Sequence, residues 1–152
     1  MFKHLHHIGV VYKDISKISK FIKDLYDIDF KIEEVTVPVN TVIRELTDPL
    51  RIKMAHATIA NTEIELFEPL DDKSIYSEYL KEVPEGGIHH IGVLVENIEE
   101  HTKKWDSMGI KRIISGVPPY KFVYYDTREM FGYVTELMDN ESPPPEMLFQ
   151  NK

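Results

Sequence analysis

The sequence contains no cysteine. This absence excludes a disulfide framework, a thiolate zinc site and a cysteine nucleophile. No apolar run approaches the roughly 20 residues that a transmembrane helix needs, and the apolar run near the N-terminus is too short for a signal peptide. Basic residues are outnumbered, because 18 Lys and Arg stand against 26 Asp and Glu and give a formal net charge of −8. We therefore expect a cytoplasmic protein with no nucleic-acid or membrane partner.

The residues that are present favour a packed globule. A chain of 152 residues is long enough for one domain, or for two small modules that share a core. Hydrophobic residues make up 42% of the chain and aromatic residues 11%, a composition too apolar for a disordered protein. Histidine is the conspicuous residue type: there are seven, and four of them form two adjacent pairs.

A repeat in the sequence contains both pairs. The string His-His-Ile-Gly-Val begins at His6 and again at His89. Each copy is followed by a residue that commonly caps helices, Asp14 or Asn97, and then by apolar residues at helical spacing. Strand-like segments come after each predicted helix. Each half therefore reads as a strand, a helix and several further strands, and the whole chain as an α+β fold.

The patterns of apolar and turn-forming residues also predict element boundaries. Strands are expected at 5–12, 30–37, 42–47, 52–59 and 62–69 in the first half, and at 88–96, 111–115, 121–126 and 133–138 in the second. A short helix at 74–83 is expected to join the halves. We divide the chain into a first module at 1–70, a connecting helix and loop at 71–86, a second module at 87–140, and an extended or disordered tail at 141–152.

Strand alternation predicts which side chains share a face of the sheet. Successive residues of a strand point to opposite faces. His7 and Glu65 in the first half, and His90 and Glu136 in the second, fall on the face turned away from the helices. If the two sheets curve toward each other, these four side chains converge in one cavity. Four other histidines are expected at the surface: His4, His6, His89 and His101.

The four converging side chains suit a metal. Two imidazoles and two carboxylates can bind a divalent ion such as Zn, Co, Mn, Ni or Fe(II), and the carboxylates balance its charge. Each residue alone has a plainer explanation. A lone histidine on a strand is usually a structural hydrogen-bonding group, and a lone glutamate on an edge strand usually faces water. The equivalent placement in both halves favours the metal site.

With these motifs the sequence resembles the vicinal oxygen chelate superfamily, the glyoxalase, bleomycin-resistance and extradiol-dioxygenase group. The resemblance covers residues 5 to about 139. It implies two tandem βαβββ modules whose curved sheets enclose a metal-binding cavity. It also implies four metal ligands, namely His7 in HHIGV, Glu65 in IELFEP, His90 in GIHHIGV and Glu136 in VTELMD. Members of the superfamily often dimerise, so a homodimer is expected by analogy.

Within the superfamily the chain is most similar to methylmalonyl-CoA epimerases, through the run IELFEPLDDKSIYSEYL and the following EGGIHHIGVLVENIEE. This implies a metal-dependent isomerase in which an ion polarises a substrate carbonyl, such as that of an acyl-CoA, while carboxylates move a proton at the neighbouring carbon. Glu136 is one candidate acid or base, and Asp48 and His56 are candidates for the second. Asp48 is one methylene shorter than the catalytic glutamate of epimerases, and residues 118–139 also depart from their pattern.

Three alternatives stay open on the sequence alone. The same ligands suit a glyoxalase-type lyase that acts on a thiol adduct. An iron-dependent dioxygenase needs only two histidines and one carboxylate, so a fourth ligand at Glu65 argues against it. A non-enzymatic small-molecule binding protein is the third, although such relatives typically lack the metal ligands. The small-molecule substrate and the metal are both left open, because loops such as 47–51 and 115–121 would set specificity.

Overall fold

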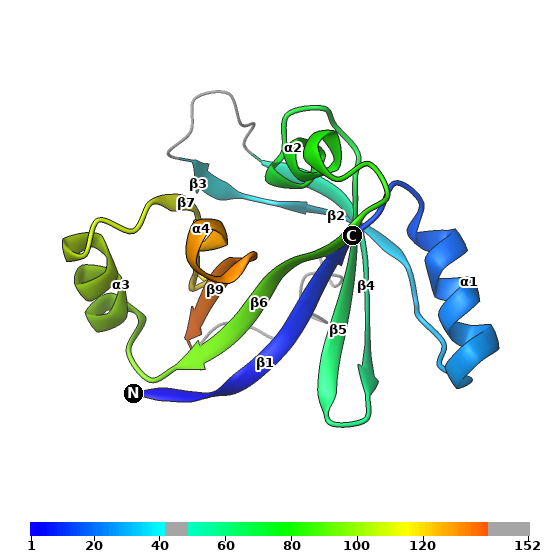
Figure 1. The fold of residues 1–152 in the computed structure, drawn as a ribbon, viewed down its shortest axis with the longest axis horizontal. Helices are drawn as coiled ribbons and strands as arrows, with labels where there is room; N and C mark the ends of the chain where they lie inside the picture. The colour runs from blue at the N-terminus through cyan, green and yellow to red at the C-terminus, as the bar shows by residue number, and fades with distance from the viewer. Residues whose placement is uncertain (42–48, 140–152) are drawn as a thin grey trace.

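The computed structural model describes residues 1–41 and 49–139. These residues form one nine-stranded sheet in the order β2-β4-β5-β1-β6-β9-β8-β7-β3, with four helices around it (Figure 1). The strands are β1 (Phe2–Val11), β2 (Glu33–Val37), β3 (Val39–Thr41), β4 (Leu50–Ile59), β5 (Thr62–Pro69), β6 (Gly87–Val95), β7 (Arg112–Gly116), β8 (Phe122–Tyr125) and β9 (Val134–Asp139). The helices are α1 (Ile15–Tyr26), α2 (Ile75–Glu82), α3 (Ile98–Ser107) and α4 (Arg128–Phe131).

The two halves of the chain have the same connectivity, which confirms the predicted fold class. β1, α1, β2, β4 and β5 repeat as β6, α3, β7, β8 and β9. In each half the first strand pairs in parallel with the last, β1 with β5 and β6 with β9. The halves join where β1 and β6 pair antiparallel. The residue-level division into modules 1–70 and 87–140 stays a prediction, while the expected strand at 42–47 and the tail at 141–152 involve residues outside the described part.

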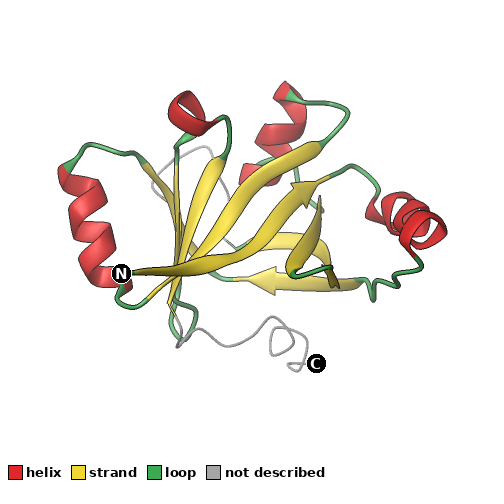
Figure 2. Ribbon diagram, turned by 60° about the horizontal axis from the view of Figure 1, so that its bottom comes forward, coloured by secondary structure: helices red, strands yellow, loops and turns green. Residues whose placement is uncertain are grey.

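One strand, β3, was not predicted. β2 and β3 lie at opposite ends of the strand order, yet only Pro38 separates them in the sequence. The two ends of the order therefore lie next to each other, and the sheet curves until it is nearly closed (Figure 2). Proline has no backbone N–H to donate to a strand ladder. Pro38 therefore suits the point where the chain leaves β2 and begins β3, which pairs with β7 of the other half.

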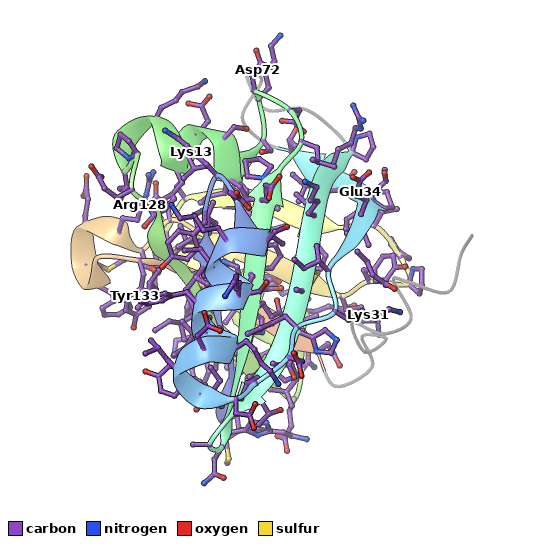
Figure 3. The ribbon with its side chains drawn as sticks, turned by 90° about the vertical axis from the view of Figure 1, so that its right-hand side faces the viewer. Lys13, Lys31, Glu34, Asp72, Arg128 and Tyr133 are labelled. Carbon is purple, nitrogen blue, oxygen red and sulfur yellow. The ribbon has the colours of Figure 1, made fainter. Side chains whose placement is uncertain are left out.

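Helices α1 and α3 begin at the predicted caps and pack on the outside of the sheet. Asp14 and Asn97 accept hydrogen bonds from the backbone N–H groups of Lys17 and Glu100. α1 lies against strands of the first half (Figure 3). Its fully buried Ile15 belongs to one cluster with Leu66 of β5. α2 begins after Ser74, as predicted, with a capping box formed by two serines. It contributes Ile75, Tyr76 and Leu80 to the main core cluster, and Tyr76 also lines the cavity on the inside of the sheet.

None of the helices found in residues 1–41 and 49–139 is both long enough and apolar enough to cross a membrane. The cytoplasmic location expected from the sequence stays a prediction.

Candidate metal centre

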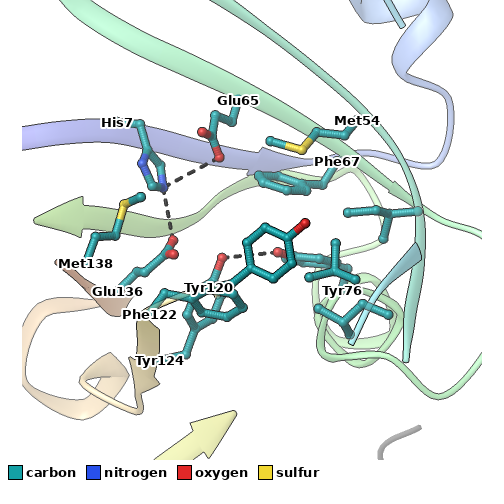
Figure 4. A pocket seen from close by; sticks show the side chains of 13 residues that line it. His7, Met54, Glu65, Phe67, Tyr76, Tyr120, Phe122, Tyr124, Glu136 and Met138 are labelled. Carbon is teal, nitrogen blue, oxygen red and sulfur yellow. Dashed lines mark hydrogen bonds and ion pairs between the residues drawn. The ribbon is translucent and has the colours of Figure 1, made fainter. Parts of the chain in front are cut away.

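Four buried side chains meet on the inside of the sheet, as strand alternation predicted. His7, Glu65, His90 and Glu136 come from β1, β5, β6 and β9, which are the four adjacent central strands. Nε2 of His7 lies 3.1 Å from Oε2 of Glu136, 3.1 Å from Nε2 of His90 and 3.7 Å from Oε2 of Glu65. Nε2 of His90 lies 3.4 Å from Oε2 of Glu136. Figure 4 shows His7, Glu65 and Glu136 pointing toward one another.

This donor set fits a divalent ion. Ligand atoms at about 2.0–2.2 Å from one ion are roughly 3.0–3.5 Å from each other in octahedral or tetrahedral geometry. The separations of 3.1, 3.4 and 3.7 Å are close to that range before any ion draws the side chains in. Donor atoms of His7, Glu65 and His90 all lie within 4.8 Å of one another. Nitrogen and oxygen ligands with two negative charges match the chemistry expected from the sequence.

Each histidine ring lies over a glycine of the other half. In the β1–β6 register, His7 is opposite Gly92, and His90 is opposite Gly9. A Cβ atom on Gly92 would lie 2.1 Å from Cε1 of His7, and one on Gly9 would lie 1.9 Å from Cε1 of His90. Only glycine fits at these positions. The glycine of each His-His-Ile-Gly-Val copy therefore makes room for the histidine of the other copy, a role that sequence reasoning missed.

The first histidine of each pair is not where alternation placed it. His89 is only 5% exposed, so the prediction of a surface position was wrong, and His6 is half-buried. The register slips by one residue at both places, so that His6 is an extra residue in β1 and His89 an extra residue in β6. A bulge of this kind interrupts alternation. His101 was also wrongly placed at the surface, since it is 9% exposed beside Phe2.

The bulges bring the two rings of each pair into contact. Nδ1 of His6 lies 3.0 Å from Nδ1 of His7, and Nδ1 of His89 lies 3.0 Å from Nδ1 of His90. His7 and His90 therefore each contact the preceding histidine through Nδ1, while their Nε2 atoms face the cluster.

Burial and mutual charge shift the pKa values within the cluster. Burial alone would lower the pKa of His7, but the carboxylates of Glu65 and Glu136 outweigh it and raise this pKa to about 9. Burial, reinforced by the charge of Glu136, raises the pKa of Glu65 to about 8. Burial and the charge of His7 hold the pKa of His90 well below its usual value. The metal-free cluster therefore holds protons near neutral pH, and a cation would displace them.

The cluster lies at one side of a cavity of about 80 Å³. Two tyrosines, Tyr76 and Tyr124, reach into it. The hydroxyl of Tyr124 lies 3.2 Å from Nε2 of His90. It also lies 3.1 Å from the hydroxyl of Tyr76, a contact drawn in Figure 4. Most of the remaining wall is apolar or aromatic: Val37, Leu50, Ile52, Met54, Phe67, Tyr120, Phe122 and Met138. The cavity suits a small, largely apolar group that presents an oxygen to the cluster.

The other two candidate acid–base residues are Asp48 and His56. Asp48 lies outside the described residues. His56 is opposite Glu65 in the β4–β5 register, but its Nδ1 lies 3.8 Å from Oε1 of Glu63, and it is not among the residues that line the cavity. The catalytic assignments of Asp48 and His56 stay predictions.

Known proteins resemble this chain in both sequence and fold. A mitochondrial methylmalonyl-CoA epimerase of Dictyostelium discoideum is 29% identical over 138 residues, which are 88% of this chain and 76% of that protein. The mouse mitochondrial enzyme is 29% identical over 94 residues, or 62% of this chain and 47% of its own length, so this chain spans about half of that relative. The eukaryotic relatives therefore differ in how much of their length is matched.

The fold and the family are established by two further matches. A methylmalonyl-CoA epimerase structure from Streptomyces coelicolor, at 17% identity, covers 95% of this chain and 100% of that chain with a TM-score of 0.66, which is a likeness of fold. The sequence profile of the Glyoxalase/Bleomycin resistance protein/Dioxygenase superfamily matches residues 6–125, most of the chain. This chain belongs to the glyoxalase/bleomycin resistance protein/dioxygenase superfamily.

Proposed function

We propose that this protein is a divalent-metal-dependent epimerase that acts on an acyl-CoA thioester in the manner of a methylmalonyl-CoA epimerase. The observation that carries the proposal is the convergence of two imidazoles and two carboxylates beside a largely apolar cavity. The epimerase names of the relatives from Dictyostelium discoideum and mouse support the choice of reaction.

His7, Glu65, His90 and Glu136 would hold the ion. A bound divalent ion would supply a Lewis acid that polarises the thioester carbonyl and stabilises the negative charge that develops on its oxygen. Zn, Co, Mn, Ni and Fe all accept such nitrogen and oxygen ligands, so the metal is left to experiment. The low net charge of the assembled site makes its burial tolerable.

Glu136 is the proposed base. With Glu136 partly released from the ion, the C–H bond next to the carbonyl would break, the proton would go to a carboxylate oxygen of Glu136, and the electron pair would move to the carbonyl oxygen. An acid on the opposite face then returns a proton to the carbon and inverts it, with no oxidation or reduction. Asp48 and His56 are retained as candidates for that acid. Tyr124 is a further candidate, because its hydroxyl lies in the cavity next to the cluster.

The size of the cavity fits the acyl end of a thioester. A cavity of about 80 Å³ is several times the roughly 10–15 Å³ that one water molecule needs, and far smaller than a CoA molecule. The acyl group would therefore enter, while the much larger CoA moiety would lie outside. The apolar wall keeps water from the enolate and strengthens the electrostatic interactions there.

Proton exchange tests the proposal directly. Metal-free protein would be loaded with Co²⁺ or Mn²⁺ and given methylmalonyl-CoA in heavy water, and deuterium at the α-carbon would be followed by NMR. We expect exchange well above the protein-free rate, and a loss of about 10²–10⁴-fold in Glu136→Gln. Glu129→Gln, which changes an exposed glutamate on α4, is the matched control and should exchange like the wild type. No exchange above background in the loaded wild type, with this and related acyl-CoA esters, would overturn the epimerase assignment.

The alternatives are weaker. The relatives with epimerase names give no support to a glyoxalase-type lyase. A dioxygenase needs open positions around a triad, whereas four donors converge here. A non-enzymatic binding protein gives no reason for two buried carboxylates beside two buried imidazoles, because burying these groups without a cation costs free energy. The homodimer stays a prediction.

A further inference from the structure

The two histidine pairs repeat one local geometry. In each pair the two Nδ1 atoms are 3.0 Å apart. The rings stand edge to face, at interplanar angles of 89° for His6 and His7 and 82° for His89 and His90. Because one nitrogen of such a contact donates and the other accepts, each pair holds one N–H between its rings. A geometry that appears twice, on two equivalent bulges, is a built feature of the fold and not a chance contact.

The direction of this hydrogen bond depends on which nitrogen faces the cluster. A neutral imidazole has one N–H and one lone pair. Nε2 of His90 faces the cluster, so it can ligate an ion only if the hydrogen is on Nδ1. Nδ1 of His90 must then donate, and Nδ1 of His89 must accept. The same holds for His7 and His6.

We propose that His6 and His89 are positioning residues for the metal centre. Each accepts a hydrogen bond from the Nδ1–H of the next histidine, which fixes the orientation of that ring and leaves Nε2 as the nitrogen that binds the ion. The inference rests on the proposed function, because it takes His7 and His90 as ligands. Partners of this kind behind a ligating histidine commonly set its tautomer and raise its basicity.

The surroundings of His89 are consistent with this role. Its ring lies 5.2 Å, between centroids, from both Tyr76 and Tyr79, so aromatic side chains of α2 hold it in place. On the other side of the His90 ring, the Tyr124 hydroxyl lies 3.2 Å from Nε2 and can donate to the lone pair that this tautomer leaves there. His6 is half-buried, so water can partly replace it. His89 is therefore expected to matter more.

Leucine and asparagine variants separate the hydrogen bond from simple packing. His89→Leu and His6→Leu remove the acceptor, whereas His89→Asn and His6→Asn retain a side-chain oxygen near the position of Nδ1. His101→Leu is the control, because His101 is a buried histidine on α3 that contacts Phe2 and does not line the cavity. Circular dichroism melting would confirm that each variant folds.

Co²⁺ binding would be measured by calorimetry and by the visible absorption of the bound ion. We expect His89→Leu to weaken binding by about 10–100-fold, the usual cost of losing such a partner, and His6→Leu to weaken it less. The asparagine variants should recover most of the affinity, and His101→Leu should bind like the wild type. Leucine variants with wild-type affinity would overturn the role. So would asparagine variants as weak as the leucine variants, because packing would then be the cause.

A readout without metal tests the direction of the hydrogen bond. Nitrogen-15 NMR of the metal-free wild type should show His90 with hydrogen on Nδ1 and a bare Nε2, and His89→Leu should lose this preference. Hydrogen on Nε2 of His90 in the wild type overturns the inference and leaves the metal site standing. A wild type that binds no Co²⁺, Zn²⁺ or Mn²⁺ instead overturns the proposed metal site, and the positioning role with it.

Discussion

Replacement of Gly92 by alanine should damage the metal site more than the fold. The new Cβ would lie 2.1 Å from Cε1 of His7, and ordinary contact begins at 3.4 Å, so the ring must retreat by more than an ångström. The backbone cannot easily yield, because β1 and β6 are the central pair of the sheet. Overpacking of this kind costs about 1–3 kcal/mol of unfolding free energy. A ligand displaced that far should cost at least the roughly 10–100-fold in affinity that a lost orienting partner does.

The assay compares unfolding in urea with Co²⁺ affinity by calorimetry, and it needs a glycine control. Gly109→Ala is suitable, because its φ of +76° strains an alanine while a Cβ there would meet nothing within 4 Å. It should cost about 1–2 kcal/mol of stability and leave Co²⁺ affinity unchanged. Gly9→Ala, whose Cβ would lie 1.9 Å from His90, should behave like Gly92→Ala. Wild-type Co²⁺ affinity in Gly92→Ala would refute the steric reasoning.

Three further predictions concern pH, metal removal and stability. The pKa values of His7 and Glu65 are raised to about 9 and about 8, and both groups must lose a proton to bind a metal, so Co²⁺ affinity should rise with pH and level off above about pH 9. Calorimetry in buffers of different pH measures this dependence, and an affinity that does not change with pH would contradict it. Chelation of the metal should lower the melting temperature, since an ion present at 100 times its Kd adds about 2.7 kcal/mol; an unchanged melting curve would argue against a site that forms only in the folded state. Ser74→Ala should cost about 1 kcal/mol in urea unfolding, because it removes the N-cap of α2, and an unaltered midpoint would contradict that role.

The fold could be predicted well because its signals are local and occur twice. The caps Asp14 and Asn97 start α1 and α3 where the sequence places them, since a side-chain oxygen near the first turn satisfies free N–H groups wherever it occurs. β3 could not be predicted, because Val39–Thr41 is too short to show a pattern and pairs with β7, far along the chain. Leu25 continues the helical spacing of the apolar residues Ile15, Ile18 and Ile22 on α1, yet it is 60% exposed.

For the candidate site, alternation found the four converging side chains but misjudged the histidines beside them. Period-two alternation holds only in an uninterrupted ladder, and the bulges at His6 and His89 arise from how β1 pairs with β6. His89, expected at the surface, is thereby buried against His90. The sequence also contains no sign that Tyr76 lies beside the site, because its hydroxyl contacts that of Tyr124, which is 48 residues away in the chain.

The sequence by itself determined the duplication, the α+β class and the chemistry of the donor set, because repeat, capping and residue type are properties of the chain alone. Tertiary structure decided how the two copies of the repeat contact each other. The antiparallel pairing of β1 with β6 places the glycine of each repeat beneath the histidine of the other. It also introduces the bulges that set His6 behind His7 and His89 behind His90. Such relations depend on strand register, and register is fixed only when the two halves pack together.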